Sequence, residues 1–142
     1  KLRGTVRCFD MEQRARIEQR FRDAIAATCT LHGLEAQLDY RVSYPATINH
    51  PEHADICAEV LTQVLGEGNV RRDLKPSMAS EDFSFMSQTR PGVYIWMGNG
   101  EDSASLHNPK YDFNDNVLPK GVQYFVELVY ALLRDGKLPK AG

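Results

Sequence analysis

The sequence has few cysteines, and their placement excludes several kinds of site. Only Cys8, Cys29 and Cys57 occur among 142 residues, they are widely spaced, and no CxxC pair is present. An odd number of scattered cysteines favours reduced, mostly buried thiols in a cytoplasmic protein over a disulfide framework. None of them lies in an electropositive turn, which argues against a catalytic cysteine.

Long apolar runs and a strong excess of charge are also absent. No apolar segment reaches the roughly 20 residues needed to span a bilayer, and the first residues, KLRGTVRCFD, lack the apolar core of a signal peptide. The net charge of −2 argues against a nucleic acid or a membrane recognised through bulk charge. The chain starts without Met on what reads as the middle of a strand, so we expect it to begin partway through a larger protein.

What is present, 42% hydrophobic and 25% charged residues, is typical of a globular rather than a disordered protein. Residues 1–9 alternate between polar and apolar side chains, which predicts a strand. Asp10 is expected to cap a long amphipathic helix that ends at Gly33. Residues 34–44 resume a strand pattern and stop at Pro45. Strand, helix and strand form half of a two-layer α/β sandwich, which leaves this unit short of core.

The pattern changes after Pro45. The segment GVYIWM, residues 92–97, is hydrophobic on both faces, as in a strand inside a helix-covered sheet. We expect a hinge at 43–49, between the end of one small domain and the C-terminal portion of a larger α/β domain. The other predicted elements of the second part are helices over 49–65, 81–87 and 118–134 and a strand over 70–74.

His107 is the first candidate for chemistry. It lies in the polar loop SLHNPKYDFND between an apolar strand and a helix, at the sheet edge where α/β proteins place their ligands. An imidazole there can be a metal ligand or a catalytic base. The alternative is a surface histidine without a role. Asn108 and Pro109 fix the backbone after it, and the polar residues that follow supply turn hydrogen bonds.

Two further segments are candidates for a binding site. In MASEDF, Ser80 is either the N-cap of a short helix, or its loop and Glu81 face the same cleft as His107. Arg7 lies on the polar face of the first predicted strand, where a guanidinium can hold a carboxylate through two parallel hydrogen bonds. Because Arg3 lies four residues earlier on the same face, a simple solvated face explains Arg7 equally well.

The remaining motifs carry little information. His32 lies beside a helix-ending glycine, where a cation suits the helix dipole. His50 and His53 are spaced closely enough to chelate a metal, but we expect no third ligand beside them. Phosphate-binding loops, dinucleotide-binding glycine patterns, GxSxG and HExxH are all missing, and GNG at 98–100 is typical of a turn.

Taken together, the motifs resemble one family. A GTVRCF strand before a long helix, MASEDF, an apolar strand ending in MGNG, and LHNPKYDFND are similar to the C-terminal part of the hippurate hydrolase and N-acyl-amino-acid amidohydrolase family. The resemblance to these aminoacylase-like two-metal peptidases covers essentially the whole chain. It implies that residues 1–46 end a two-layer α/β lid (dimerisation) domain and that 47–142 form the C-terminal part of a three-layer α/β/α catalytic domain.

The resemblance also implies roles for the candidate residues. His107 would be a metal ligand, Arg7 would bind the carboxylate of the substrate, and the loop with Ser80 and Glu81 would border the substrate. The expected cofactors are two divalent metal ions, zinc or manganese, and the expected substrate is a small N-acyl amino acid such as hippurate. The expected partner is a second copy bound through the lid domain, with no nucleic acid and no membrane.

The other metal ligands of that family do not occur in this sequence. They belong to a segment with cysteine or aspartate, a GHDxH-type motif, a Glu-Glu pair and a further histidine. One imidazole cannot hold a catalytic metal that needs three or four ligands. We therefore expect an inactive C-terminal fragment without a tightly bound metal. The alternative is a non-catalytic module that dimerises or binds a small acid through Arg7 and the Ser80 loop, with His107 structural.

Overall fold

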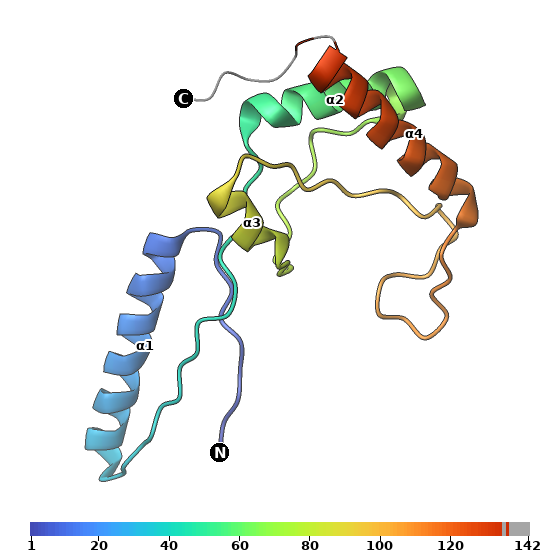
Figure 1. Ribbon diagram of the computed structural model, residues 1–142. Helices are drawn as coiled ribbons and strands as arrows, with labels where there is room; N and C mark the ends of the chain where they lie inside the picture. The colour runs from blue at the N-terminus through green and yellow to red at the C-terminus, as the bar shows by residue number, and fades with distance from the viewer. Residues whose placement is uncertain (135, 137–142) are drawn as a thin grey trace. The chain divides into compact units, whose positions relative to one another are not determined.

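The computed structural model describes residues 1–134 and 136. Within this part the regular structure is helical, as Figure 1 shows. The α-helices are α1 (Met11–His32), α2 (Pro51–Leu65), α3 (Phe83–Thr89) and α4 (Leu118–Val129), and the shorter elements are the 3-10 turns η1 (Glu67–Asn69) and η2 (Asp115–Val117) and the π-helical turn η3 (Tyr130–Arg134).

The chain forms two compact units. The first consists of Lys1–Ile48 and Pro76–Thr89, and the second of Asn49–Lys75 and the chain from Arg90 onward. The expected division into a lid domain over 1–46 and a catalytic domain over 47–142 stays a prediction. None of the helices in the described residues is both long enough and apolar enough to cross a membrane.

Helix α1 has the two ends that the sequence predicted. The Asp10 carboxylate accepts a hydrogen bond from the backbone N–H of Glu12 at 2.7 Å, which satisfies one of the N–H groups left free in a first helical turn. Gly33 adopts a left-handed conformation with φ 62°. This conformation lets the N–H of Leu34 reach the carbonyl of Cys29 at 2.8 Å and closes the helix.

The predicted strands at 1–9 and 34–44 are wrong for the described structure, in which no strand is formed. A strand exists only where a neighbour supplies a ladder of backbone hydrogen bonds, and neither segment has one. Most of the apolar side of the first segment is uncovered, since Leu2 is 99% and Val6 42% exposed. The second segment is held by side chains instead. The ring centroids of Tyr40 and Phe21 are 6.4 Å apart, and Cζ of Arg22 lies over the Tyr40 ring, 5.9 Å from its centroid.

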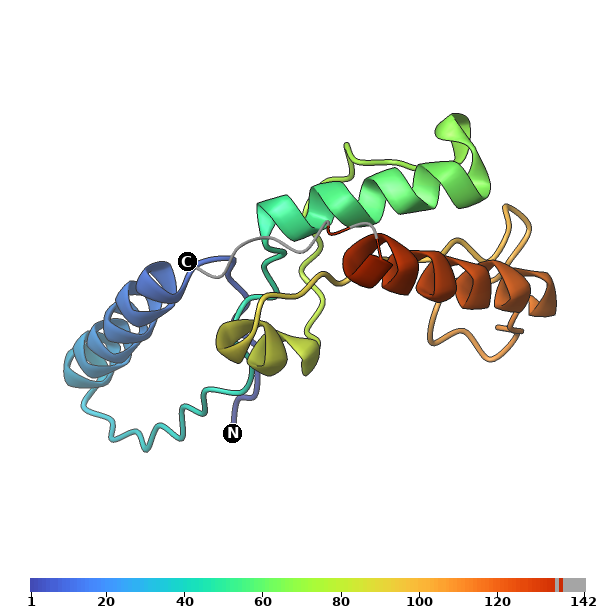
Figure 2. The same ribbon diagram turned by 45° about the horizontal axis from the view of Figure 1, so that its top comes forward.

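The core of the second unit lies between α2 and α4, which run side by side (Figures 1 and 2). Val60 on α2 is 1% exposed, and Tyr124 on α4 is 3% exposed. Burial, together with a hydrogen bond to Cys57, raises the pKa of the Tyr124 hydroxyl above its ordinary value. The buried hydrophobic residues are Cys57, Val60, Tyr124 and Ala131, with Val93 and Ile95 packed against them.

The apolar segment 92–97 is likewise not a strand among the described residues. Its backbone is bound by two residues that precede α2. The Asn49 side chain accepts a hydrogen bond from the N–H of Tyr94 at 2.8 Å and donates one to the Tyr94 carbonyl at 2.9 Å. The N–H of His50 donates to the carbonyl of Gly92 at 3.3 Å, and the N–H of Gly92 donates to Nδ1 of His50 at 3.1 Å. Two residues thus take the place of a neighbouring strand.

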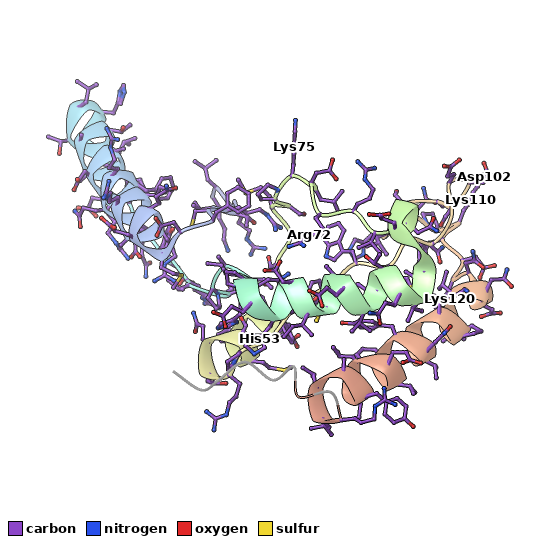
Figure 3. All side chains as sticks on the ribbon, turned by 90° about the horizontal axis from the view of Figure 1, so that it is seen from above. His53, Arg72, Lys75, Asp102, Lys110 and Lys120 are labelled. Atoms are coloured by element: carbon purple, nitrogen blue, oxygen red, sulfur yellow. The ribbon has the colours of Figure 1, made fainter. Side chains whose placement is uncertain are left out.

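The predicted strand at 70–74 is also wrong for the described residues. This segment is tied to α2 by an ion pair between Arg72, labelled in Figure 3, and Asp55. Both side chains are largely exposed, so the pair contributes little to stability.

The predicted helices are confirmed, with shifted ends. The helix expected over 81–87 is α3, which begins at Phe83, and the helix expected over 118–134 is α4 followed by the turn η3. The predicted layers of helices on sheets are not seen in the described part of the chain, since no sheet is formed there.

The core of the second unit can be tested with two substitutions of the same kind. Val60→Ala removes two methyl groups from a fully buried position, and we expect the free energy of unfolding to fall by about 1–3 kcal/mol. Val122→Ala, on the outer face of α4 where the valine is 62% exposed, should change it by less than about 0.5 kcal/mol. Urea unfolding followed by circular dichroism measures both, and equal losses would contradict a core between α2 and α4.

Candidate functional site

The first unit brings two of the predicted site segments into contact. The Arg7 guanidinium donates through Nη1 to the Ser80 hydroxyl at 3.2 Å and to the backbone carbonyl of Met78. The two segments are more than 70 residues apart in the sequence. Arg7 therefore does not simply extend into solvent, although its side chain remains exposed.

Both hydrogen bonds of Arg7 leave from the same nitrogen, and both acceptors are neutral oxygens. Nε and Nη2 donate to no described residue, and Arg7 forms no ion pair with one. A guanidinium has five N–H donors in a planar fork, so an edge of the fork is left for another acceptor. A carboxylate fits such an edge with two parallel hydrogen bonds.

The interpretation of Ser80 as a helix N-cap is wrong. Helix α3 begins at Phe83, three residues later, and the Ser80 hydroxyl accepts from Arg7 instead. The turn before the helix is built by its neighbours: the N–H of Asp82 donates to the Glu81 carboxylate at 3.0 Å, and the N–H of Ser84 donates to the Glu81 carbonyl at 3.2 Å.

Glu81 and Asp82 place two carboxyl groups side by side. The hydrogen bond between the side chains, and the charge of Glu81, raise the pKa of Asp82 above its ordinary value. Two neighbouring carboxylates repel each other, so one of them holds its proton to higher pH.

In the second unit, His107 occupies a strained backbone position. Its φ is 65°, and it is the only residue other than glycine with a positive φ in the described chain. The N–H of Asn108 donates to the carbonyl of Ser105 at 3.1 Å, which makes His107 the third residue of a tight turn. Glycine or asparagine is favoured at such a position because other side chains crowd the left-handed conformation. Strain of this kind is concentrated at functional sites.

The loop that carries His107 is closed at its base by Asn99 and Asn114. The Asn99 side chain accepts from the N–H of Asn114 at 2.8 Å, and the Asn114 side chain donates to the carbonyl of Asn99 at 3.2 Å. Sequence reasoning missed Asn99, since it treated GNG as an ordinary turn, and it expected Asn114 only to supply turn hydrogen bonds, as it does to the N–H of Asn116. A signal was available, because an asparagine stands at each end of a long polar loop between two apolar segments.

The same loop surrounds an open hollow of about 340 Å³. Figure 3 shows Asp102 and Lys110 on this loop. The hollow is lined by Asn99, Gly100, Glu101, Asp102, Ser103, Ala104, Lys110, Asp112 and Asn114. His107 does not line it.

The candidate residues are divided between the units. Arg7, Ser80 and Glu81 belong to the first, and His107 belongs to the second. Each unit therefore contributes one candidate group, and the cleft expected to hold all four residues stays a prediction.

The described residues do not form a complete metal site. Among residues 1–134 and 136, no three His, Cys, Asp or Glu side chains come together in a way that could hold a metal ion. His107 supplies a single imidazole. The rings of His50 and His53 are 6.0 Å apart between centroids, and because Nδ1 of His50 accepts the N–H of Gly92, only Nε2 of that ring is left for a metal. A centre with three or four ligands is thus not made from these residues alone.

Comparisons with known proteins give a consistent result. The model of peptidase family M20/M25/M40 matches residues 5–131. Hippurate hydrolase of Campylobacter jejuni is 30% identical over 133 residues, which are 94% of this chain and 34% of that protein. No solved structure matches the chain.

Two other relatives carry different names. N-acetylcysteine deacetylase of Bacillus subtilis is 27% identical over 134 residues, or 94% of this chain and 34% of that protein. Thermostable carboxypeptidase 1 of Saccharolobus solfataricus is 25% identical over 138 residues, or 94% of this chain and 33% of that protein. The chain spans about a third of the length of these curated relatives.

The paired carboxyl groups at the Ser80 loop give a testable titration. Replacing Glu81 by Gln removes the neighbouring charge, and we expect the pKa of Asp82 to fall toward its ordinary value. Because the pKa in the folded protein is raised, the repulsion destabilises the fold as pH rises through that pKa, and this loss should shrink in the variant. A carbon-13 NMR titration of the Asp82 carboxyl measures the shift. Glu101→Gln is the control, and an equal shift there would contradict the pairing.

Proposed function

The chain belongs to peptidase family M20/M25/M40, and from this membership we propose that it is the C-terminal part of a metal-dependent amidohydrolase that cleaves the amide bond of N-acyl amino acids. Because the chain covers about a third of its relatives, the activity belongs to a longer polypeptide that includes these residues. The family relation supports hydrolysis, and the substrate and the metal are the parts we propose.

The substrate class is supported by the names of two relatives. Hippurate and N-acetylcysteine, named for the proteins of Campylobacter jejuni and Bacillus subtilis, are both amides of an amino acid nitrogen, and both end in a free carboxylate. A site that serves this class needs a cation for the carboxylate. It also needs to align the amide for attack, since alignment supplies a large part of the rate.

Arg7 is the observation that carries this proposal. Its guanidinium is held at Nη1 by Ser80 and Met78, and the remaining edge of the fork is open. We assign the open edge to the substrate carboxylate. Ser80 then orients Arg7, and Glu81 borders the bound substrate.

His107 is proposed as one ligand of a divalent metal, zinc or manganese, whose other ligands lie outside the 142 residues. The support is the combination of an exposed imidazole and a strained backbone in a loop joined to a helix. A second copy of the protein, bound through residues 1–46, is the proposed partner. A non-catalytic module that binds a small acid through Arg7 is the alternative that the following experiments exclude or support.

Arg7 is tested in the complete enzyme with an N-acyl amino acid as substrate. Arg7→Ala should lower kcat/KM by roughly 10- to 100-fold, the effect of losing a charge-assisted hydrogen bond. Arg7→Lys should recover only part of the loss, because an ammonium lacks the planar fork. Arg3→Ala is the matched control and should have wild-type kinetics.

The chemistry of the substrate separates binding from general damage. For the wild type, kcat/KM should be lower for a substrate whose carboxylate is replaced by a carboxamide, by a factor similar to that of Arg7→Ala. Arg7→Ala should not discriminate between the two substrates. Equal discrimination by wild type and variant would remove Arg7 from the carboxylate site.

His107 is tested with asparagine rather than alanine, because asparagine tolerates the left-handed backbone that this position requires. His107→Asn therefore removes the imidazole and keeps the turn. We expect the metal affinity of the complete enzyme to fall by more than the ~10- to 100-fold typical of losing an outer-shell partner, together with turnover. Metal analysis and kinetics measure the two effects, with His32→Asn as control. Normal metal content and turnover in His107→Asn would favour the non-catalytic module.

A further inference from the structure

We propose that Asn99 is a positioning residue, which fixes the loop over residues 100–113 so that His107 keeps its turn conformation. The inference rests on the proposed role of His107 and adds a residue whose side chain acts through the loop. Neither Asn99 nor its partners are among the residues assigned to metal or substrate above.

The side chain of Asn99 binds both arms of the loop. In the first arm, Nδ2 donates to the Ser103 hydroxyl at 2.6 Å. In the second arm, Nδ2 donates to the backbone carbonyl of Asp112 at 2.7 Å, and Oδ1 accepts the N–H of Asn114 at 2.8 Å. His107 lies between the two arms.

These contacts use the donors and the acceptor of a carboxamide together. An amide group offers two N–H donors and one carbonyl oxygen, and each of them has a partner here. A carboxylate has the same shape but accepts only, so it would leave the Ser103 hydroxyl without its donor and face the Asp112 carbonyl oxygen. The position therefore requires asparagine and rejects aspartate.

The hydrogen bonds of Asn99 to the two arms affect His107 through the loop backbone. A residue other than glycine leaves the left-handed conformation readily unless its surroundings hold it there. The turn at Ser105–Asn108 is internal to the loop and closed by a single backbone hydrogen bond. With the arms separated, nothing else in the described hydrogen bonds of residues 104–109 joins this turn to the rest of the unit. Asn99 thus keeps the loop closed around a strained residue.

Asn99→Asp is the direct test, with Asn116→Asp as its control. Asn116 is exposed and its side chain makes no hydrogen bond to a described residue, so the control adds the same charge at the end of the same loop. Hydrogen–deuterium exchange over residues 100–114 should become about 10-fold faster or more in Asn99→Asp, because protection follows local opening. It should stay unchanged in Asn116→Asp.

Kinetics of the complete enzyme supply the second measurement. Asn99→Asp should lower kcat by roughly 10- to 100-fold, as a misplaced group does, with KM for the N-acyl amino acid within about 3-fold, since Arg7 is untouched. If Asn99→Asp fails to fold, Ser103→Ala removes one of the three contacts and should accelerate exchange in the same peptide by a smaller factor.

The outcomes separate this inference from the proposed function. Unchanged exchange in Asn99→Asp overturns the positioning role. Faster exchange with normal kcat, in an enzyme that His107→Asn inactivates, also overturns it and leaves Asn99 purely structural. Normal turnover in His107→Asn refutes the proposed function instead, whatever the exchange shows.

Discussion

Backbone that is neither helix nor sheet still carries N–H and C=O groups that need partners, and in this chain asparagine side chains meet much of that need. Asn49 bonds both backbone groups of Tyr94. Asn99 bonds backbone groups of Asp112 and Asn114. A carboxamide can do this because it presents a donor and an acceptor side by side, as a peptide group does. The irregular part of the second unit depends on these asparagine side chains, which supply the backbone hydrogen bonds that a neighbouring strand would otherwise supply.

Helices were predictable from the sequence because their signals are local. Asp10 and Gly33 lie next to the ends that they set, and the cap hydrogen bonds span only a few residues. The strands were not predictable in the same way. The alternation in residues 1–9 describes which side chains could face a core, but a ladder depends on a neighbour that the pattern does not specify. The segment around Tyr40 is an example: it forms no ladder with any described residue and is held by a ring contact with α1.

The same distinction between local signals and long-range contacts applies to the candidate site. Arg7, Ser80 and His107 could be named one at a time as candidates, from residue type and expected position, and their roles came from the family resemblance. That the Ser80 hydroxyl receives the Arg7 guanidinium could not be predicted, because the two are distant in sequence and a serine before acidic residues also fits a helix cap. Nor does the sequence around His107 reveal its left-handed backbone. Asn99 was overlooked because a GNG triplet reads as a turn, whereas its side chain acts across the loop.

The oxygens that hold Arg7 have an electrical consequence. A carbonyl and a hydroxyl orient the guanidinium but leave its charge in place. A carboxylate partner would neutralise that charge. The full positive charge is therefore available to an incoming anion, and it lies at an exposed position. Dissolved ions shield such a charge over about 8 Å at physiological ionic strength. Capture of an acidic ligand at Arg7 should accordingly weaken in concentrated salt, while the neutral contacts that orient the arginine persist.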